Sequence, residues 1–208
     1  MVAIIDYGVG NLFSLVSSFN YIGIPAAATA DPDVIRNADH IILPGVGAFR
    51  DAIGKLNESG LGELVKEVAA SGKPVMGICL GMQLLLDKSY EYGEYEGLGL
   101  ISGSVRPIAD VIDPELKVPQ IGWNALSFTG RNDTGAGKGI FKYTREGDHV
   151  YFVHSYYCAD CEEAVTSVCE YSAPLTASVQ KGNVYGCQFH PEKSGDVGLG
   201  ILRAFCEL

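Results

Sequence analysis

The sequence predicts an α/β fold with a central, mostly parallel sheet, helices on both faces and a smaller antiparallel part. Through the first half, short apolar runs alternate with stretches in which apolar residues recur at helical spacing. After residue 100, short strand-like segments follow one another. The chain has 208 residues, of which 47% are hydrophobic, which suffices for one well-buried core but not for two ordinary domains. We therefore expect one domain over residues 1–208.

The acidic net charge of the chain argues against two classes of partner, nucleic acids and membranes. The chain carries 25 acidic and 15 basic residues, a formal net charge of -10, and no basic cluster. Such a surface repels a phosphate backbone and an anionic membrane, so we expect neither nucleic acid nor a membrane as partner. No apolar run approaches the roughly twenty residues that span a bilayer, and Met1 leads into an apolar segment without an export signal. These features predict a cytoplasmic protein.

The first segments predict a strand, a loop and a helix. Residues 1–5 form a short apolar run, and apolar residues recur at helical spacing between Leu12 and Phe19. The loop between them begins Gly8-Val9-Gly10, as in dinucleotide-binding loops, but Phe13 stands where the third glycine would fall. We therefore predict no nucleotide cofactor. The loop is either a tight turn or a polar loop at the carboxyl edge of the sheet.

A second glycine-rich loop follows the third predicted strand. Residues 24–28 form a weak strand and residues 40–43 a stronger one, which ends in the loop at residues 44–49. This loop lacks the Lys-Ser/Thr pair of a phosphate-binding loop. Two helical stretches come next, and they lead to an apolar strand at residues 74–78.

The cysteine that follows this strand is the main candidate for catalysis. Cys79 stands between the strand and a helix predicted to open at residues 82–86, and it is flanked by Gly77 and Gly81. Gly-x-Cys-x-Gly is the nucleophile-elbow pattern with sulfur in place of the serine oxygen, because the glycines let backbone pass close to a strained nucleophile. A helix N-terminus favours the thiolate. The alternative is a small, buried, inert side chain.

A second segment supplies partners for Cys79. The strand predicted at residues 184–189 ends in His190-Pro191-Glu192. Side chains two apart on an extended chain share a face, and a proline excludes helix at the residue before it, so His190 and Glu192 can point to one site. A cysteine, a base and a carboxylate that orients the base form the generalised catalytic triad.

Backbone groups of two segments are candidates for an oxyanion hole. In a nucleophile elbow, one donor is the N–H of the residue after the nucleophile, which here is Leu80. The other comes from a neighbouring loop, and the glycine-rich loop offers Val46 and Gly47.

Six cysteines raise the question of disulfides or a metal. A chain of this size with a good core and no export signal is expected to keep free thiols. Cys158 and Cys161 form a close pair, but zinc needs about four ligands and only Cys169 follows, at a loose spacing. The alternatives are a zinc pair and a turn between two strands, and we predict no metal.

The remaining segments complete the sheet and the surface. Residues 118–124 contain the only tryptophan, Trp123, in an irregular connection, where it fits either a core residue or an interface anchor. His154 lies inside a predicted strand, residues 150–157, without a nearby carboxylate, so we rank it below His190 as a base.

The other segments predict a loop, a hairpin, short strands and a final helix. An acidic and aromatic loop at residues 89–100 leads to short strands, and residues 131–138 predict a surface hairpin. Two further strands come before the His-Pro-Glu turn, and a final helix over residues 197–206 closes the domain.

The two catalytic segments together resemble those of class I (triad-type) glutamine amidotransferases. They read Gly-Ile-Cys-Leu-Gly-Met-Gln at residues 77–83 and Gln-Phe-His-Pro-Glu at residues 188–192. Further segments, along the whole chain, are similar to the glutaminase subunits of imidazole glycerol phosphate synthase. They are residues 6–12, 44–49, 97–101, 118–124 and 151–156.

The resemblance implies a flavodoxin-like domain and a function in histidine biosynthesis. L-glutamine would be hydrolysed without a cofactor, through a glutamyl thioester. The ammonia would pass to a (β/α)8 barrel cyclase, the partner subunit of a heterodimeric, lyase-type synthase. That cyclase makes imidazole glycerol phosphate and aminoimidazole carboxamide ribotide.

The resemblance also implies residue roles. The triad would be Cys79, His190 and Glu192, and the oxyanion donors would come from Val46, Gly47 and Leu80. The amino acid end of glutamine would be held by Gln83, Glu91, Ser155 and Tyr156, and a carboxylate such as Glu91 suits the substrate ammonium. Candidates for the partner interface are Asn11, Pro119, Trp123, Asn124 and Lys193. One departure is Gln120-Ile121, where a His-Met pair commonly precedes Gly-Trp-Asn.

Other functions stay open from the residues alone. The glutaminase of pyridoxal phosphate synthase is also a chain of this size, but it typically carries Pro-Gly-Gly-Glu-Ser where this chain has Pro44-Gly45-Val46-Gly47. A partner-independent cysteine hydrolase is a second alternative. An inactive, regulatory relative is a third, and the presence of all three triad residues argues against it.

Overall fold

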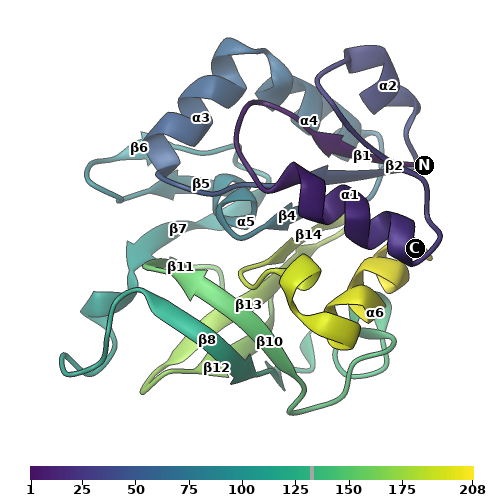
Figure 1. The fold of residues 1–208 in the computed structure, drawn as a ribbon. Coiled ribbons are helices and arrows are strands. Elements are labelled where there is room, and N and C mark those ends of the chain that lie inside the picture. Colours follow the sequence, from purple (N-terminus) through teal and green to yellow (C-terminus); the bar gives the residue numbers. More distant parts are fainter. Residues whose placement is uncertain (132–133) are drawn as a thin grey trace.

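The main sheet joins a parallel half to an antiparallel half. The computed structural model describes residues 1–131 and 134–208 (Figure 1). The sheet has eight strands in the order β2-β1-β3-β4-β14-β13-β12-β9. The parallel strands are β1 (Val2–Ile5), β2 (Ala26–Thr29), β3 (His40–Leu43), β4 (Val75–Ile78) and β14 (Val184–Cys187). The antiparallel strands are β13 (Pro174–Lys181), β12 (Val165–Glu170) and β9 (Ser127–Phe128).

Helices cover both faces of the parallel half, which confirms the predicted layers (Figure 1). One face carries α1 (Leu12–Tyr21) and α6 (Gly195–Phe205), and the other carries α2 (Pro32–Asn37), α3 (Phe49–Glu58) and α4 (Leu61–Ala70). Successive side chains of a strand point to opposite faces. In β1, Val2 and Ile4 belong to the core under α1 and α6, whereas Ala3 and Ile5 belong to the core under the other helices.

Two smaller sheets adjoin the main one. The four-stranded sheet has the order β11-β7-β5-β6 and is mostly antiparallel. Its strands are β5 (Leu86–Ser89), β6 (Tyr95–Glu96), β7 (Ile101–Pro107) and β11 (Tyr156–Ala159). The second is an antiparallel pair of β8 (Gln120–Ala125) and β10 (His149–His154). Short 3-10 turns are η1 (Ile108–Asp110), η3 (Gly139–Phe141) and η4 (Pro191–Lys193).

Three local predictions differ from the structure. The helix after Cys79 is shorter than predicted: α5 covers Leu80–Leu84, and the chain turns into strand β5 at Leu86, whose pairing with Ile101 overrides helical propensity. The strand predicted at residues 150–157 is broken at Ser155 into β10 and β11.

The third difference is at residues 118–124, which form strand β8 from Gln120 rather than an irregular connection. The prediction of an irregular connection rests on Pro119 and Gly122, but the chain pairs as a strand from Gln120 onward. The burial of this strand is inverted: Gln120 is 1% exposed, whereas Ile121 and Trp123 are 61% and 53% exposed. The hairpin predicted at residues 131–138 includes residues 132 and 133, which lie outside the described residues.

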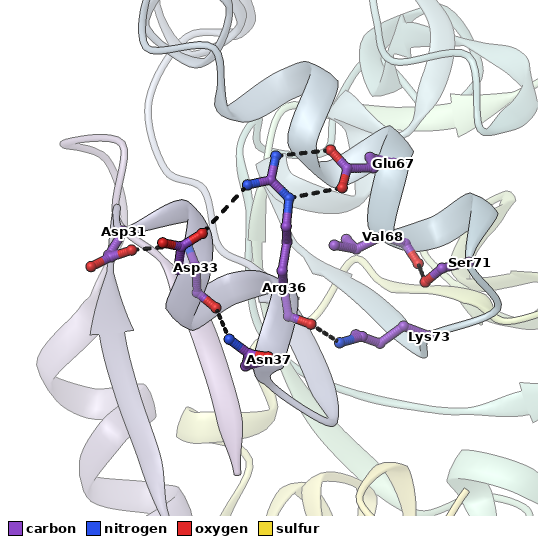
Figure 2. A network of polar contacts seen from close by, with 8 residues as sticks. All are labelled: Asp31, Asp33, Arg36, Asn37, Glu67, Val68, Ser71 and Lys73. Carbon is purple, nitrogen blue, oxygen red and sulfur yellow. Dashed lines mark hydrogen bonds and ion pairs between the residues drawn. The ribbon is translucent and has the colours of Figure 1, made fainter.

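Polar contacts at one corner hold the start of β4 in place (Figure 2). Arg36 of α2 donates to both carboxylate oxygens of Glu67 in α4, at 2.8 and 3.0 Å. The Nζ of Lys73 donates to the carbonyl of Arg36 at 2.7 Å and to that of Ala38. Exposed ion pairs contribute little to stability, about 1 kcal/mol or less. Their effect is positional, because Lys73 stands just before β4, the strand that ends at Cys79.

Within the described residues, no helix has the length and apolar composition needed to cross a membrane.

Candidate active site

Cys79 occupies a strained turn between β4 and α5. Its φ of 55° and ψ of -112° are unusual for a residue with a side chain. The turn needs glycine on both sides, because a Cβ at Gly77 would lie 2.6 Å from the carbonyl oxygen of Gly81. A Cβ at Gly81 would lie 1.9 Å from the carbonyl oxygen of Leu43. The strain and the two close approaches are the geometry that the Gly-x-Cys-x-Gly pattern predicts.

His190 and Glu192 form a buried pair beside the turn. The ring Nδ1 of His190 lies 2.8 Å from Oε1 of Glu192, and their side chains are only 3% and 2% exposed. The backbone of His190 is fixed as well, because its N–H donates to the carbonyl of Tyr151 at 3.0 Å. The hydroxyl of Ser194 donates to the carbonyl of His190 at 2.6 Å. Hydrogen bonds thus hold both the backbone and the ring of His190 in one orientation.

The environment of His190 favours its charged form. Burial opposes protonation of the ring, but hydrogen bonds to Cys79 and Glu192, together with the charges of both, outweigh burial and raise the pKa of His190 to about 9. An imidazolium beside a sulfur is the arrangement that stabilises a thiolate.

We expect this shift to make stability depend on pH between about 6.5 and 9. The folded protein holds the His190 proton up to about pH 9, whereas an unfolded histidine releases it near 6.5. The folded state therefore binds more protons in this window, and the free energy of unfolding falls as pH rises. The stabilisation is complete below about pH 6.5 and is lost as pH passes about 9.

Urea unfolding across this pH range would measure the effect in wild type and in His190→Gln. Wild type should lose stability more steeply than His190→Gln, because the cysteines outside this site contribute equally to both proteins. Parallel curves would contradict the raised pKa of His190.

His154 lies in the same cavity but has different chemistry. Burial lowers the pKa of His154 to about 4, although its hydrogen bond to the Tyr156 carbonyl opposes the shift. The ring is therefore neutral near pH 7. Its Nδ1 lies 2.8 Å from that carbonyl and so carries the hydrogen, while its buried Nε2 has no partner in the described part of the chain. The geometry favours His190 over His154 as the residue that exchanges protons with Cys79.

A cavity of about 340 Å³ brings most of the predicted site residues together. Its walls are formed by Val46, Gly47, Cys79, Leu80, Gln83, Glu91, Pro119, Val153, His154, Ser155, Tyr156, His190 and Lys193. Of the predicted residues, Glu192 lies behind His190 rather than on the wall, and Asn11, Trp123 and Asn124 do not line the cavity. A larger cavity of about 680 Å³, around residues 160–164 and 180–182, contains none of the triad residues.

Two polar side chains line the cavity. Gln83 is 4% exposed, and its amide donates to the carbonyl of Tyr156 at 3.0 Å. Glu91 accepts the backbone N–H of Phe49 at 2.6 Å. Burial raises the pKa of the Glu91 carboxyl, and the hydrogen bond from Phe49 opposes the shift. Both are suited to bind the polar end of a small ligand.

The glycine-rich loop packs directly on the turn that carries Cys79. A Cβ at Gly45 would lie 2.6 Å from the backbone nitrogen of Gly81. The next residues are open: Val46 is 44% exposed, and Gly47 has a φ of 91° with free space around it. The backbone of Val46 and Gly47 therefore lies at the cavity beside Leu80, where the predicted oxyanion donors would meet.

The predicted interface residues are arranged around the mouth of the cavity and beyond it. Pro119 is exposed there, and the Nζ of Lys193 lies 5.9 Å from the ring centroid of Tyr151. The exposed ring of Trp123 packs edge-on against the same tyrosine at 6.0 Å. Trp123 is therefore an exposed residue and not a core residue.

The two predicted asparagines have partners within the chain. Asn124 accepts from Gln120 at 2.9 Å and donates to the carbonyl of Glu170 at 3.2 Å. Asn11 is exposed and accepts from the N–H of Ser14, which caps α1.

The other cysteines differ from Cys79. All six are free, and burial raises the pKa of Cys161 to about 12 and that of Cys169 to about 11. Cys158 is fully buried, which raises its pKa well above the ordinary value of a thiol. In the described residues, no group of three or more His, Cys, Asp or Glu side chains is placed to hold a metal ion. Cys158 lies in β11, and Cys161 lies in the connection to β12, just before the turn at residues 162–164.

Sequence reasoning missed Gln188 as a site residue. It is completely buried, and its side-chain amide contacts both Cys79 and Gln83. A signal was available, because Gln188 is an amide in the apolar run before His190, and a buried amide needs polar partners.

Comparisons with known proteins identify the family and the fold of the chain. Residues 3–206 match the family model described as glutamine amidotransferase class-I. The solved structure described as a glutamine amidotransferase covers 100% of the chain and 98% of its own, with a TM-score of 0.75 at 20% identity. PurLQS from Thermotoga maritima covers 99% and 97%, with a TM-score of 0.74 at 19% identity. These two show the fold.

Curated relatives are closer in sequence. The HisH subunit of imidazole glycerol phosphate synthase from Caldanaerobacter subterraneus subsp. tengcongensis is 47% identical over 212 residues, which is 100% of this chain and 98% of the relative. That from Geobacter sulfurreducens is 45% identical, with the same coverage. That from Listeria monocytogenes serovar 1/2a is 44% identical, over 100% and 96%. The chain therefore belongs to the class-I glutamine amidotransferases and, among them, to the HisH glutaminase subunits of imidazole glycerol phosphate synthase.

Proposed function

We propose that this chain hydrolyses the side-chain amide of L-glutamine at Cys79, as the glutaminase subunit of an imidazole glycerol phosphate synthase in histidine biosynthesis. The observation that carries the proposal is the strained cysteine beside a buried, charged histidine in a cavity of about 340 Å³. A cavity of this size suits a small substrate.

The first half of the reaction forms a glutamyl thioester. The Cys79 thiolate attacks the amide carbon of glutamine, and the carbonyl oxygen becomes an oxyanion. His190, which carries a proton, gives it to the amide nitrogen as the C–N bond breaks, and ammonia leaves. His190 suits the role of acid because its pKa is raised to about 9, and Glu192 orients the ring through Nδ1.

The second half consumes a water molecule. His190, now neutral, takes a proton from water, whose oxygen attacks the thioester carbon. The C–S bond then breaks, which releases glutamate and restores the thiolate and the imidazolium. No step needs a metal or an organic cofactor.

The oxyanion is proposed to bind backbone N–H groups of Leu80 and of the loop at Val46 and Gly47. Support comes from the position of these residues on the cavity wall beside Cys79. Removing one such donor costs roughly 3 to 4 kcal/mol of transition-state stabilisation in comparable sites.

The amino acid end of glutamine is proposed to lie between Gln83 and Glu91, with the backbone of Ser155 and Tyr156. Gln83 donates both of its amide hydrogens within the protein, so it can offer a substrate ammonium its carbonyl oxygen. Glu91 adds a carboxylate on the same cavity wall.

The relatives are named as subunits, so a partner subunit belongs to this family. We propose that the partner here is a (β/α)8 barrel cyclase that receives the ammonia. Docking would occur at the cavity mouth, where Pro119, Trp123 and Lys193 are exposed. Asn11 and Asn124 are more distant candidates for the same contact. A cytoplasmic location stays a prediction.

The test is glutamate release from glutamine by the purified chain, alone and with a barrel cyclase plus its nucleotide ligand. Strong stimulation by the complex is the expected result. Equal rates with and without the cyclase would point to a partner-independent hydrolase, and no release under either condition would overturn the proposal.

A further inference from the structure

One buried amide connects the nucleophile to the substrate-binding wall. Gln188 follows β14, is 0% exposed, and its backbone N–H donates to the carbonyl of Ala177 at 2.8 Å. Its side-chain Oε1 accepts from the amide of Gln83 at 3.0 Å. Its Nε2 lies 3.8 Å from the sulfur of Cys79 and donates to it. The side chain is therefore held at both ends by residues of the cavity.

The direction of the Gln188 amide is fixed by its neighbour. Gln83 donates one hydrogen to the carbonyl of Tyr156 and the other to Gln188. Gln188 must present its oxygen to Gln83, so its NH₂ group faces Cys79. The chain of contacts runs from the substrate-binding backbone through two amides to the sulfur.

The groups that contact the sulfur favour different protonation states of Cys79. The carbonyl of Val153 lies 3.9 Å away and can accept only from the thiol. Gln188 donates, and so favours the thiolate, as does the hydrogen bond to His190. The charge of Cys79 contributes to the raised pKa values of His190, Tyr7 and the buried Cys158, so these are the titratable groups that interact with it. Gln188 is uncharged and does not titrate with them.

We propose that Gln188 is a positioning residue, which donates a hydrogen bond to the Cys79 thiolate and holds Gln83 in register with it. The inference rests on the proposed function, because it concerns the same nucleophile. It assigns two separable tasks to one side chain: its nitrogen supports the sulfur, and its oxygen orients the residue that binds substrate.

Two substitutions separate these tasks. Gln188→Met fills the same space but removes both polar contacts. Gln188→Glu keeps an acceptor for Gln83 and, once ionised, replaces the donor beside the sulfur with a negative charge. The pH dependence of Cys79 reactivity should shift in Gln188→Met and shift further in Gln188→Glu. If Gln188 only filled space, the negative charge introduced by Gln188→Glu would cause no further shift.

The measurement is the rate of iodoacetamide labelling of Cys79 against pH, read by mass spectrometry of its peptide in the full-length chain. Peptide resolution separates Cys79 from the five other cysteines. We expect the half-maximal pH to rise by about one unit in Gln188→Met, the size of one lost hydrogen bond to an anion, and further in Gln188→Glu. The KM for glutamine should rise in Gln188→Met and stay near wild type in Gln188→Glu.

The chain offers a matched control. Gln120 is also buried, and its amide donates to the sulfur of Cys169 at 3.7 Å. Gln120→Met loses a contact of the same kind, and the labelling of Cys79 should keep its wild-type pH dependence. Circular dichroism would verify that each variant is folded.

The outcomes separate this inference from the proposed function. An unmoved labelling curve in folded Gln188→Met and Gln188→Glu would overturn the inference even if glutamate release is confirmed. A shifted curve would support the contact to the sulfur even if the wild-type chain released no glutamate, a result that would overturn the proposed function alone.

Discussion

Glutamate release by Cys79→Ala is expected to fall at least about 10⁴-fold below wild type. The thiolate is the only nucleophile on the cavity wall, in the described part of the chain, that stands beside a charged histidine. Without the sulfur there is no thioester, and His190 cannot compensate because it moves protons and does not bond to carbon.

The protein should remain folded, since the change removes one atom from a residue that is 7% exposed. The measurement is glutamate release in the presence of the partner and its ligand, where the wild-type rate is highest. Cys206→Ala is the control, because Cys206 is half-buried at the end of α6 and does not line the active cavity. Residual activity of Cys79→Ala above one per cent of wild type would refute the assignment of the nucleophile.

Glu192→Gln is expected to lower kcat by roughly 10² to 10⁴ while KM for glutamine changes little. The side chain keeps its shape and can still accept from Nδ1 of His190 through its carbonyl oxygen. What it loses is the negative charge, which together with Cys79 holds the pKa of His190 at about 9. The imidazolium becomes less stable, and the ring is a poorer acid for the departing ammonia.

Nuclear magnetic resonance of the four histidines would follow the ring directly. His190 should titrate at a lower pH in Glu192→Gln than in wild type, whereas His154 should stay neutral to about pH 4 in both. Glu58→Gln, an exposed residue of α3, is the matched control. An unchanged His190 titration together with wild-type kcat would show that Glu192 does not orient the base.

The turn around Cys79 could be predicted from sequence because its cause is local. Gly77 and Gly81 each stand two residues from the cysteine, and the close approach that requires Gly77 is to Gly81, within the turn. The close approach that requires Gly81 is to Leu43 of β3, so that one depends on the packing of the fold. The pairing of His190 with Glu192 is also local, because Glu192 follows His190 by two residues. The predicted reason, an extended chain, is wrong: Glu192 belongs to the 3-10 turn η4 (Pro191–Lys193), and this turn brings its carboxylate to the ring.

The cavity as a whole could not be assembled from sequence pattern. It joins residues near 46, 79–83, 91, 119, 153–156 and 190, and only the fold brings these segments together. Gln188 and His154 show the difficulty: each is a polar residue in a strand-like run, and what it does depends on side chains far away in sequence. The physical pattern predicted the triad and the oxyanion candidates Val46, Gly47 and Leu80. The resemblance to a family predicted the substrate-binding candidates Gln83, Glu91, Ser155 and Tyr156.

Strand β8 is an exception to the rule that the apolar face of a strand is the buried one. Alternation of apolar and polar residues predicts which face is buried, but in β8 the polar Gln120 is inside and Ile121 and Trp123 are outside. Single exposed apolar side chains are common on proteins, and exposed apolar side chains mark an interaction surface only where they form a larger patch.

The proposed triad residues Cys79 and His190 follow two neighbouring strands of the main sheet, so their relative position depends on the pairing of those strands. Cys79 follows β4 and His190 follows β14, and these two strands are neighbours at the centre of the main sheet, paired from Val75 with Val184 to Ile78 with Cys187. The N–H of Cys79 donates to the carbonyl of Cys187 at 2.7 Å, which extends the ladder to the nucleophile. The proposed nucleophile thus lies at the end of this ladder. The proposed acid lies three residues beyond Cys187, where its N–H donates to the Tyr151 carbonyl of β10. A fluctuation that separates β4 from β14 must open the interior of the main sheet, so the relative position of the two residues depends on central strands rather than on surface loops alone.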